Sequence, residues 1–336
     1  MTEPAKKHIN LALQGGGAHG AFTWGVLDAL VADGRLVFDA ISGTSAGAMN
    51  AVVMVDGLAR GGADGARQHL ENFWKAVSRE GSGNAADVFN RLMGFWDLPS
   101  PLAYFQHLSN LVSPYGINPL NINPLKETIG GLVDFANVRA STGPRLFISA
   151  TNVRNGKIRI FTGKDVTADA VMASACLPYI FQAVEIEGEA YWDGGYTGNP
   201  ALFPFFEDRG SDDILLVQVN PLRREEIPRS ATEIVERASE ITFNASLLRE
   251  LRAIDFVNRM IAENRLDAKK YRRNLLHRID ATTALASYTA STRLDTSWRF
   301  FEELKTAGQK AAKAWLKTHF DDLGERATLD LRHEFM

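Results

Sequence analysis

The chain has 336 residues, 45% hydrophobic and 23% charged, which is typical of a globular protein with one large domain or a core with an appendage. A net charge of −3 gives no overall basic field, so nucleic-acid binding is not expected. The single cysteine, Cys176, excludes an intramolecular disulfide and favours a reducing compartment. The N-terminus lacks a signal-like apolar stretch, and the apolar segment 46–58 is too short to span a bilayer. We therefore expect a cytoplasmic protein that touches membranes only peripherally, if at all.

The first half of the sequence alternates strand-like and helix-like patterns. An apolar run at 8–14 is followed by three glycines and a helical pattern from 18 to about 32. A second apolar run at 37–42 is followed by the segment 43–47 and a helical pattern to about Leu58. Two successive strand–glycine–helix units predict a parallel sheet with helical crossovers. Further strands are expected at 145–152, 157–162, 213–220 and 275–280.

Two regions depart from this alternation, the segment 81–130 and the region from about residue 229 onward. Segment 81–130 is rich in Pro, Asn, Phe, Trp and Leu without a clear period, which indicates a lid or an acyl-binding insertion. Its aromatic residues either line an acyl-chain channel or pack under a long loop: Phe95, Trp96, Tyr104, Phe105 and Tyr115. The basic cluster at 269–273 either faces an anionic membrane or is simply solvated.

The region from about 229 onward has mostly helical patterns, at 231–262 and 296–318. Its apolar residues predict that it packs on the core or on another subunit: Ile234, Ile241, Leu248, Leu251 and Ile254. The domain prediction is therefore a catalytic domain at 8–220, followed by a mostly helical C-terminal extension at 229–336. The sequence does not indicate the oligomeric state.

A candidate nucleophile lies in the segment Gly43-Thr44-Ser45-Ala46-Gly47, which has the pattern G-x-S-x-G between a strand and a helix. A serine on such a sharp turn projects its hydroxyl above the sheet, and the flanking glycines let strand and helix pass closely. The start of the helix directs free N–H groups toward developing negative charge. The alternative is an ordinary glycine-rich turn.

A serine nucleophile needs a general base. None of the seven histidines lies at a strand end in a setting that marks it as one: His8, His19, His69, His107, His277, His319 and His333. The more distinctive segment is Asp193-Gly194-Gly195, whose glycines let the loop bring a carboxylate close to another backbone element. In isolation, Asp-Gly-Gly is also a common turn.

Four blocks in order resemble the patatin-like phospholipase family over roughly residues 8–200. They are Gly15-Gly16-Gly17-Ala18-His19-Gly20, the 43–47 segment, the stretch 173–181, and Asp193-Gly194-Gly195. The resemblance implies a three-layer α/β/α fold with a mainly parallel central sheet. It implies that Ser45 and Asp193 form a dyad without histidine, that the amides of Gly15, Gly16 and Gly17 form an oxyanion hole, and that Gly20, Gly43, Gly47, Gly194 and Gly195 support these motifs.

The reaction implied is hydrolysis of lipid carboxylic esters through an acyl-serine intermediate, as in a phospholipase, lysophospholipase or esterase. No cofactor or metal is expected, since the sequence has no metal cluster with usable spacing. One position departs from the family pattern, because the family usually carries Arg or Lys where this chain has His19. His19 is expected either to contact a substrate headgroup or to be a solvated residue of the first helical turn.

Three other functions remain open. An acyltransferase would use the same dyad but pass the acyl group to an alcohol. A non-catalytic lipid-binding or regulatory protein would keep the fold alone. A dinucleotide-binding protein would use Gly15, Gly17 and Gly20 as G-x-G-x-x-G, but the acidic residue expected at the end of the second strand is absent, since Asp39 lies near that strand's start.

Overall fold

The structure is a computed structural model, and it describes residues 6–81, 113–207, 210–286, 288, 292–293 and 295–335. At its centre lies a mixed sheet whose order is β5-β6-β3-β2-β1-β7-β8, with β4 paired to β3. The strands are β1 (Lys7–Leu13), β2 (Leu36–Gly43), β3 (Arg145–Asn152), β4 (Ile158–Phe161), β5 (Val184–Ile186), β6 (Glu189–Asp193), β7 (Asp213–Gln218) and β8 (Leu275–Asp280).

The sheet is mainly parallel, as the sequence predicts. The pairs of β1 with β2 and β7, of β2 with β3, and of β7 with β8 are all parallel. The shorter strands β4, β5 and β6 form antiparallel pairs beyond β3. In the parallel part, the carboxyl ends of the strands meet at one edge of the sheet, which is where open α/β sheets place their sites.

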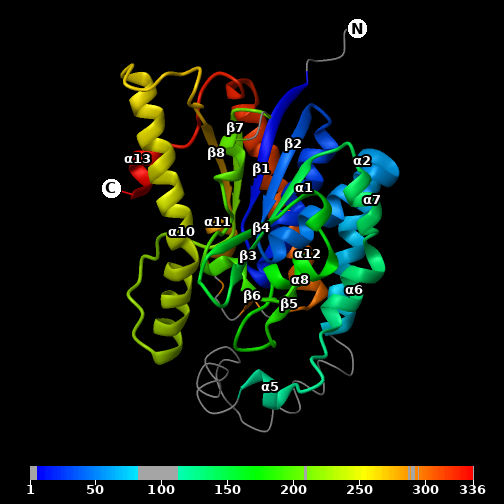
Figure 1. The fold of residues 1–336 in the computed structure, drawn as a ribbon. Helices are drawn as coiled ribbons and strands as arrows, with labels where there is room; N and C mark the ends of the chain where they lie inside the picture. The colour runs from blue at the N-terminus through cyan, green and yellow to red at the C-terminus, as the bar shows by residue number, and fades with distance from the viewer. Residues whose placement is uncertain are drawn as a thin grey trace.

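Alternating side chains of the central strands bury both faces of the sheet. In β1, Ile9, Leu11 and Leu13 join one apolar core, whereas Ala12 joins the other. The first core contains residues of α1 (Gly20–Asp33), α2 (Ala46–Gly81), α8 (Ala168–Ser174) and α12 (Trp298–His319). The second contains residues of α9 (Pro204–Glu207), α10 (Ala231–Ala262) and α13 (Leu331–Phe335). Helices thus cover both faces, which confirms the three-layer prediction (Figure 1).

The C-terminal region is built into this architecture. Strand β8 extends the central sheet beside β7, and α12 packs along α1. The two helices approach so closely that a Cβ added at Gly25 of α1 would collide with the carbonyl oxygen of Lys305, and one added at Gly308 of α12 would collide with that of Phe22. The region after 229 therefore shares the sheet and the core of the preceding residues.

The remaining short helices are α5 (Pro114–Ile117), α6 (Pro124–Leu132), α7 (Phe135–Ala140) and α11 (Thr282–Leu285). Single 3₁₀ turns are η1 (Gly17–His19), η2 (Gly163–Asp165), η3 (Gly194–Tyr196) and η5 (Phe320–Asp322). Of the expected insertion at 81–130, residues 82–112 lie outside the described part of the chain, and with them Phe95, Trp96, Tyr104 and Phe105. Tyr115, in α5, is 58% exposed.

Two sequence predictions need correction here. The second helix continues to residue 81 instead of ending near Leu58, with a break at Gly61 and Gly62, where the backbone is not helical. In α10, Leu251 and Ile254 pack on the sheet as expected, but Ile234 and Ile241 are exposed, because a helix that covers one face of the sheet turns its opposite side outward.

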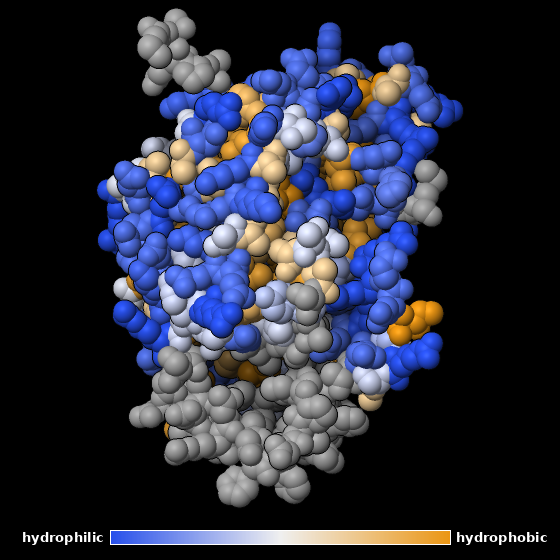
Figure 2. Space-filling model, turned by 180° about the vertical axis from the view of Figure 1, so that it is seen from behind, coloured by the Kyte–Doolittle hydropathy of each residue, from blue (hydrophilic) through white to orange (hydrophobic). Residues whose placement is uncertain are grey.

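One face of the molecule is polar over most of the area that its described residues form. Figure 2 shows hydrophilic side chains covering most of the side opposite to the view of Figure 1, with smaller hydrophobic areas between them. None of the helices in the described ranges combines the length and the apolarity that crossing a bilayer requires. In the basic cluster, Lys269, Lys270 and Arg273 are exposed, whereas Arg272 pairs with Asp212.

Candidate active site

Ser45 occupies a strained turn between β2 and α2, at the edge where the parallel strands end. Its φ of 54° lies in the left-handed region, which is rare for a residue with a side chain and is characteristic of functional turns. The turn is tight, because a Cβ added at Gly47 would collide with the carbonyl oxygen of Leu13 in β1. The backbone N–H of Ser45 donates to Ser174 Oγ at 2.9 Å, which fixes the turn against α8.

Asp193 is the last residue of β6, and its side chain is directed into the interior. It is 1% exposed, and its Oδ1 accepts a hydrogen bond of 2.7 Å from the backbone N–H of Gly195. Burial raises the pKa of Asp193 from 3.8 to about 7, although hydrogen bonds from the Gly195 amide and the Ser45 side chain oppose the rise. The structure therefore brings together the serine and the aspartate that are 148 positions apart in the sequence.

The glycines after Asp193 are required by close contacts. A Cβ at Gly194 would collide with the backbone oxygen of Ser149 in β3, and one at Gly195 would collide with the ring of Phe243 in α10. The loop that carries the carboxylate is thus pressed between the sheet and a helix from the C-terminal region.

The glycine-rich segment after β1 lies directly beside Ser45. A Cβ added at Gly15 would lie 2.8 Å from Ser45 Cβ. The Gly15 N–H donates to Asn199 Oδ1 at 2.7 Å, so this amide is already engaged in the structure. The amides of Gly16 and Gly17 show no hydrogen-bond partner among the described residues. An oxyanion hole in this conformation would therefore use Gly16 and Gly17, with Gly15 as an anchor.

A buried polar network, which the sequence analysis missed, holds the glycine segment in place. Asn220 Nδ2 donates to the Gly15 carbonyl at 2.6 Å, and Arg293 Nη2 donates to Asn220 Oδ1 at 2.7 Å. The Gln14 carboxamide accepts from the Asn220 N–H at 2.8 Å and donates to Asn244 Oδ1 at 2.9 Å. The only available signal was that Asn220 is a polar residue two positions beyond a buried strand.

A pocket of about 110 Å³ lies at this site. The catalytic candidates Ser45 and Asp193 lie in its wall beside the three glycines. Its apolar lining comes from Leu177, Tyr179, Ile180, Tyr196 and Phe243, and its polar lining from Asn220, Ser239 and Arg293. The pocket therefore offers both apolar and polar groups to a substrate whose ester lies at Ser45.

His19 differs from one of the two expectations for it. It is 4% exposed, its Nε2 lies 2.7 Å from Thr292 Oγ1, and its ring packs against Phe300 of α12. Burial, together with the charges of Arg293 and Arg224, lowers the pKa of His19 to about 3, so the ring is neutral. A neutral imidazole enclosed by the C-terminal region is not a solvated residue of the first helical turn, so that expectation was wrong; contact of His19 with a headgroup stays a prediction.

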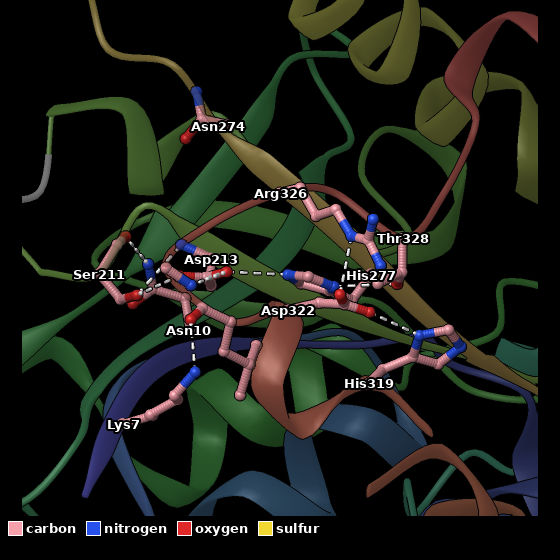
Figure 3. Close-up of polar contacts among 12 residues, drawn as sticks. Lys7, Asn10, Ser211, Asp213, Asn274, His277, His319, Asp322, Arg326 and Thr328 are labelled. Carbon is pink, nitrogen blue, oxygen red and sulfur yellow. Dashed lines mark hydrogen bonds and ion pairs between the residues drawn. The ribbon is translucent and has the colours of Figure 1, made fainter. Parts of the chain in front are cut away.

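The one buried histidine–carboxylate pair in the described ranges lies at the other end of the sheet. His277 Nε2 is 2.9 Å from Asp213 Oδ1, and its Nδ1 is 2.9 Å from Thr328 Oγ1 (Figure 3). Asp213 begins β7, and Ser45 follows the carboxyl end of β2. A strand of that length separates the two ends by roughly 20 Å. This pair therefore cannot serve Ser45, and it joins β8 to the chain near Thr328.

No group of three or more His, Cys, Asp or Glu within the described ranges is placed to hold a metal ion. Cys176 is buried, and burial raises the pKa of its thiol to about 12, so the thiol stays protonated.

The sequence is similar to a known protein family and to several solved structures. A family model described as "Patatin-like phospholipase" matches residues 11–206, which include Ser45, Asp193 and the three glycines. A search of curated proteins gives no match. Among solved structures, VipD from Legionella pneumophila is 16% identical, with a TM-score of 0.37, and the match covers 90% of this chain and 68% of that one.

A chain from the complex of full-length SpcU with full-length ExoU of the Pseudomonas aeruginosa type III secretion system is 15% identical, with a TM-score of 0.31. That match covers 92% of this chain but only 53% of the other. The match of the family model spans more than half of the sequence and contains every residue expected to react. The chain belongs to the patatin-like phospholipase family.

Proposed function

We propose that this protein hydrolyses carboxylic esters of lipids through an acyl-serine intermediate, with Ser45 as nucleophile and Asp193 as general base. The observation that carries the proposal is the position of Ser45 on a strained turn beside a buried carboxylate. Burial raises the pKa of that carboxylate to about 7. A base is most effective when its pKa lies near the working pH, because it is then both ionised and able to hold the proton.

In the first step, Asp193 accepts the hydroxyl proton as Ser45 Oγ attacks the ester carbonyl carbon. The carbonyl oxygen becomes an oxyanion, which the N–H groups of Gly16 and Gly17 stabilise. The backbone of this segment is fixed before the reaction, so little reorganisation is needed as the charge develops. Collapse of the intermediate breaks the bond to the alcohol, which takes the proton from Asp193 and leaves an acyl-serine.

Water then attacks the acyl-serine while Asp193 accepts its proton, and the proton returns to Ser45 Oγ as the fatty acid leaves. The apolar residues Leu177, Ile180 and Phe243 of the pocket suit the start of an acyl chain. An alcohol in place of water would give the acyltransferase reaction. Measuring free fatty acid against transferred acyl product separates these two reactions of the same dyad.

Labelling with a fluorophosphonate probe tests the nucleophile. The probe should modify one residue, identified as Ser45 by peptide mass spectrometry, and the label should disappear in Ser45→Ala. Ser239→Ala is the matched control, because Ser239 lines the same pocket but does not lie on the strained turn. Labelling that persists in Ser45→Ala, or that is lost in Ser239→Ala alone, would refute the assignment.

A further inference from the structure

One of the polar residues that line the pocket is the cation Arg293, which lies outside residues 11–206, the segment matched by the family model. Arg293 precedes α12, and its side chain is only 14% exposed. Its backbone oxygen lies against the glycine segment, 2.5 Å from where a Cβ at Gly17 would be. Arg293 is also one of the residues that line the pocket containing Ser45. Arg293 thus contacts the glycine segment and borders the pocket.

The hydrogen bonds of Arg293 leave part of its guanidinium available. Nη2 donates to Asn220 Oδ1 at 2.7 Å, and the buried Nε has no hydrogen-bond partner within the part of the chain that the structure describes. A buried guanidinium N–H without a partner is costly, so such a group commonly marks a place where a ligand binds. Nε and Nη are also the pair of donors with which arginine binds phosphate or carboxylate in a bidentate way.

The carboxylate nearest to Arg293 is largely neutralised by other arginines. Glu240 Oε1 lies 3.7 Å from Arg293 Nη2, but it accepts a hydrogen bond of 2.6 Å from Arg224, and Glu240 Oε2 accepts one of 3.1 Å from Arg237. With Glu236 as the second carboxylate near this cluster, three guanidinium groups face two carboxylates. The cluster therefore carries one positive charge in excess, and Arg293 is its member that lines the pocket.

We propose that Arg293 is a specificity-determining residue that binds the phosphate group of a phospholipid whose ester carbonyl lies at Ser45. This inference rests on the proposed function. In a glycerophospholipid, a short glycerol unit joins the acyl ester to the phosphate, so an anion-binding group in the same pocket as the nucleophile meets it there. The acyl chain then lies against the apolar residues of the pocket, while Arg293 holds the phosphate.

The test compares two esters with the same acyl chain, a lysophospholipid and a monoacylglycerol, both below their aggregation concentrations. Arg293→Gln should lower kcat/KM for the lysophospholipid by about 10- to 100-fold, the worth of a charge-assisted hydrogen bond. The monoacylglycerol reports the loss that comes only from weaker support of the glycine segment, so its kcat/KM should fall at least about tenfold less than that of the lysophospholipid. Arg293→Lys should restore part of the loss, because it returns the charge without the planar fork.

The matched control is Arg223→Gln, which removes a positive charge from an exposed residue of the same region that does not line the pocket. Its ratio of the two kcat/KM values should equal that of the wild type. Equal losses for both esters in Arg293→Gln would mean that Arg293 only supports the glycine segment, and no loss for either would mean that it does not meet the substrate. Both results overturn the inference.

A binding measurement keeps the inference testable if the proposed hydrolysis fails. Calorimetry on Ser45→Ala can use an ether-linked lysophospholipid, which has no ester, and the matching alkylglycerol. Adding Arg293→Gln should weaken binding of the phosphate-bearing ether lipid by about tenfold or more, and leave that of the alkylglycerol unchanged. Inorganic phosphate that binds as tightly as the ether lipid would overturn the lipid assignment and indicate a site for free phosphate.

Discussion

Replacing Asp193 by asparagine should lower the esterase activity and raise the stability at neutral pH. The proposed reaction needs the buried carboxylate, but its ionisation destabilises the fold. Asparagine has nearly the same shape as aspartate, but it is neutral and cannot accept the proton of Ser45. Esterase activity should therefore fall by about two to four orders of magnitude, the usual contribution of a general base. The oxyanion amides and the pocket remain, so some activity above the uncatalysed rate should persist.

The same substitution should make the protein more stable at neutral pH. Because the pKa of Asp193 is about 7 in the folded protein and near 3.8 when unfolded, the folded state favours the protonated carboxyl. Between about pH 4 and pH 7 the unfolded chain has released this proton and the folded chain retains it, so stability falls as the pH rises. At ~1.4 kcal/mol per pKa unit, the ionised carboxylate costs about 4 kcal/mol above pH 7.

Urea unfolding followed by tryptophan fluorescence, at pH 5 and pH 8, measures this cost. The free energy of unfolding of Asp193→Asn should exceed that of the wild type by about 2–4 kcal/mol at pH 8, because the asparagine amide must also be desolvated. At pH 5 the advantage should be smaller by about 2–3 kcal/mol, since the wild-type carboxyl is then mostly protonated.

Glu250→Gln is the matched control for this experiment. Burial also raises the pKa of Glu250 to about 7, but Glu250 accepts hydrogen bonds from the backbone of Leu202 and Phe203 and does not line the pocket. Its variant should show a similar pH-dependent gain in stability with little change in activity. The reasoning about Asp193 would be refuted if Asp193→Asn were no more stable than the wild type at pH 8, or if its advantage were the same at both pH values.

Two further predictions concern the ionisation of the site and the buried histidine. The kcat/KM of the wild type should rise with pH and level off above about pH 7, because only the ionised Asp193 accepts a proton; a flat profile from pH 5 to 8 would contradict this. His19→Arg should lower the free energy of unfolding by about 2–4 kcal/mol, because it places a second guanidinium in the buried space beside Arg293. Its preference between phosphate-bearing and neutral esters should stay unchanged, and a raised preference would show that residue 19 does meet the headgroup.

Much of the sheet could be predicted from the sequence, because the central strands are short apolar runs, and glycine-rich segments follow the first two of them. The expected runs at 8–14, 37–42 and 213–220 correspond to β1, β2 and β7 within two residues at each end. Helix α8 and the short helices α6 and α7 were missed, since they are too short for a helical period to stand out. Helix α2 was predicted too short, because its glycines at 61 and 62 resemble a stop.

The candidate site was predictable only where its chemistry is local in sequence. Ser45 lies on a turn whose strand, glycines and helix are adjacent in the chain. His19, by contrast, is buried by Thr292 and Phe300, more than 270 positions away, and no local pattern shows this. Asn199 and Arg293 were missed for the same reason, since their contacts with Gly15, Asn220 and Gly17 join distant parts of the chain.

These distant contacts give the C-terminal region a physical role in the chemistry. A free three-glycine segment would lose about 1–2 kcal/mol of conformational entropy per residue on being fixed. If this entropy were lost only as the transition state forms, the cost would offset the stabilisation that the glycine amides give to the oxyanion. The contacts of Asn220 and Arg293, and the bond from Gln14 to Asn244 of α10, fix the segment during folding instead. The reacting groups of the proposed mechanism lie in the first 200 residues, but the preorganisation that would make its oxyanion hole effective depends on residues beyond them.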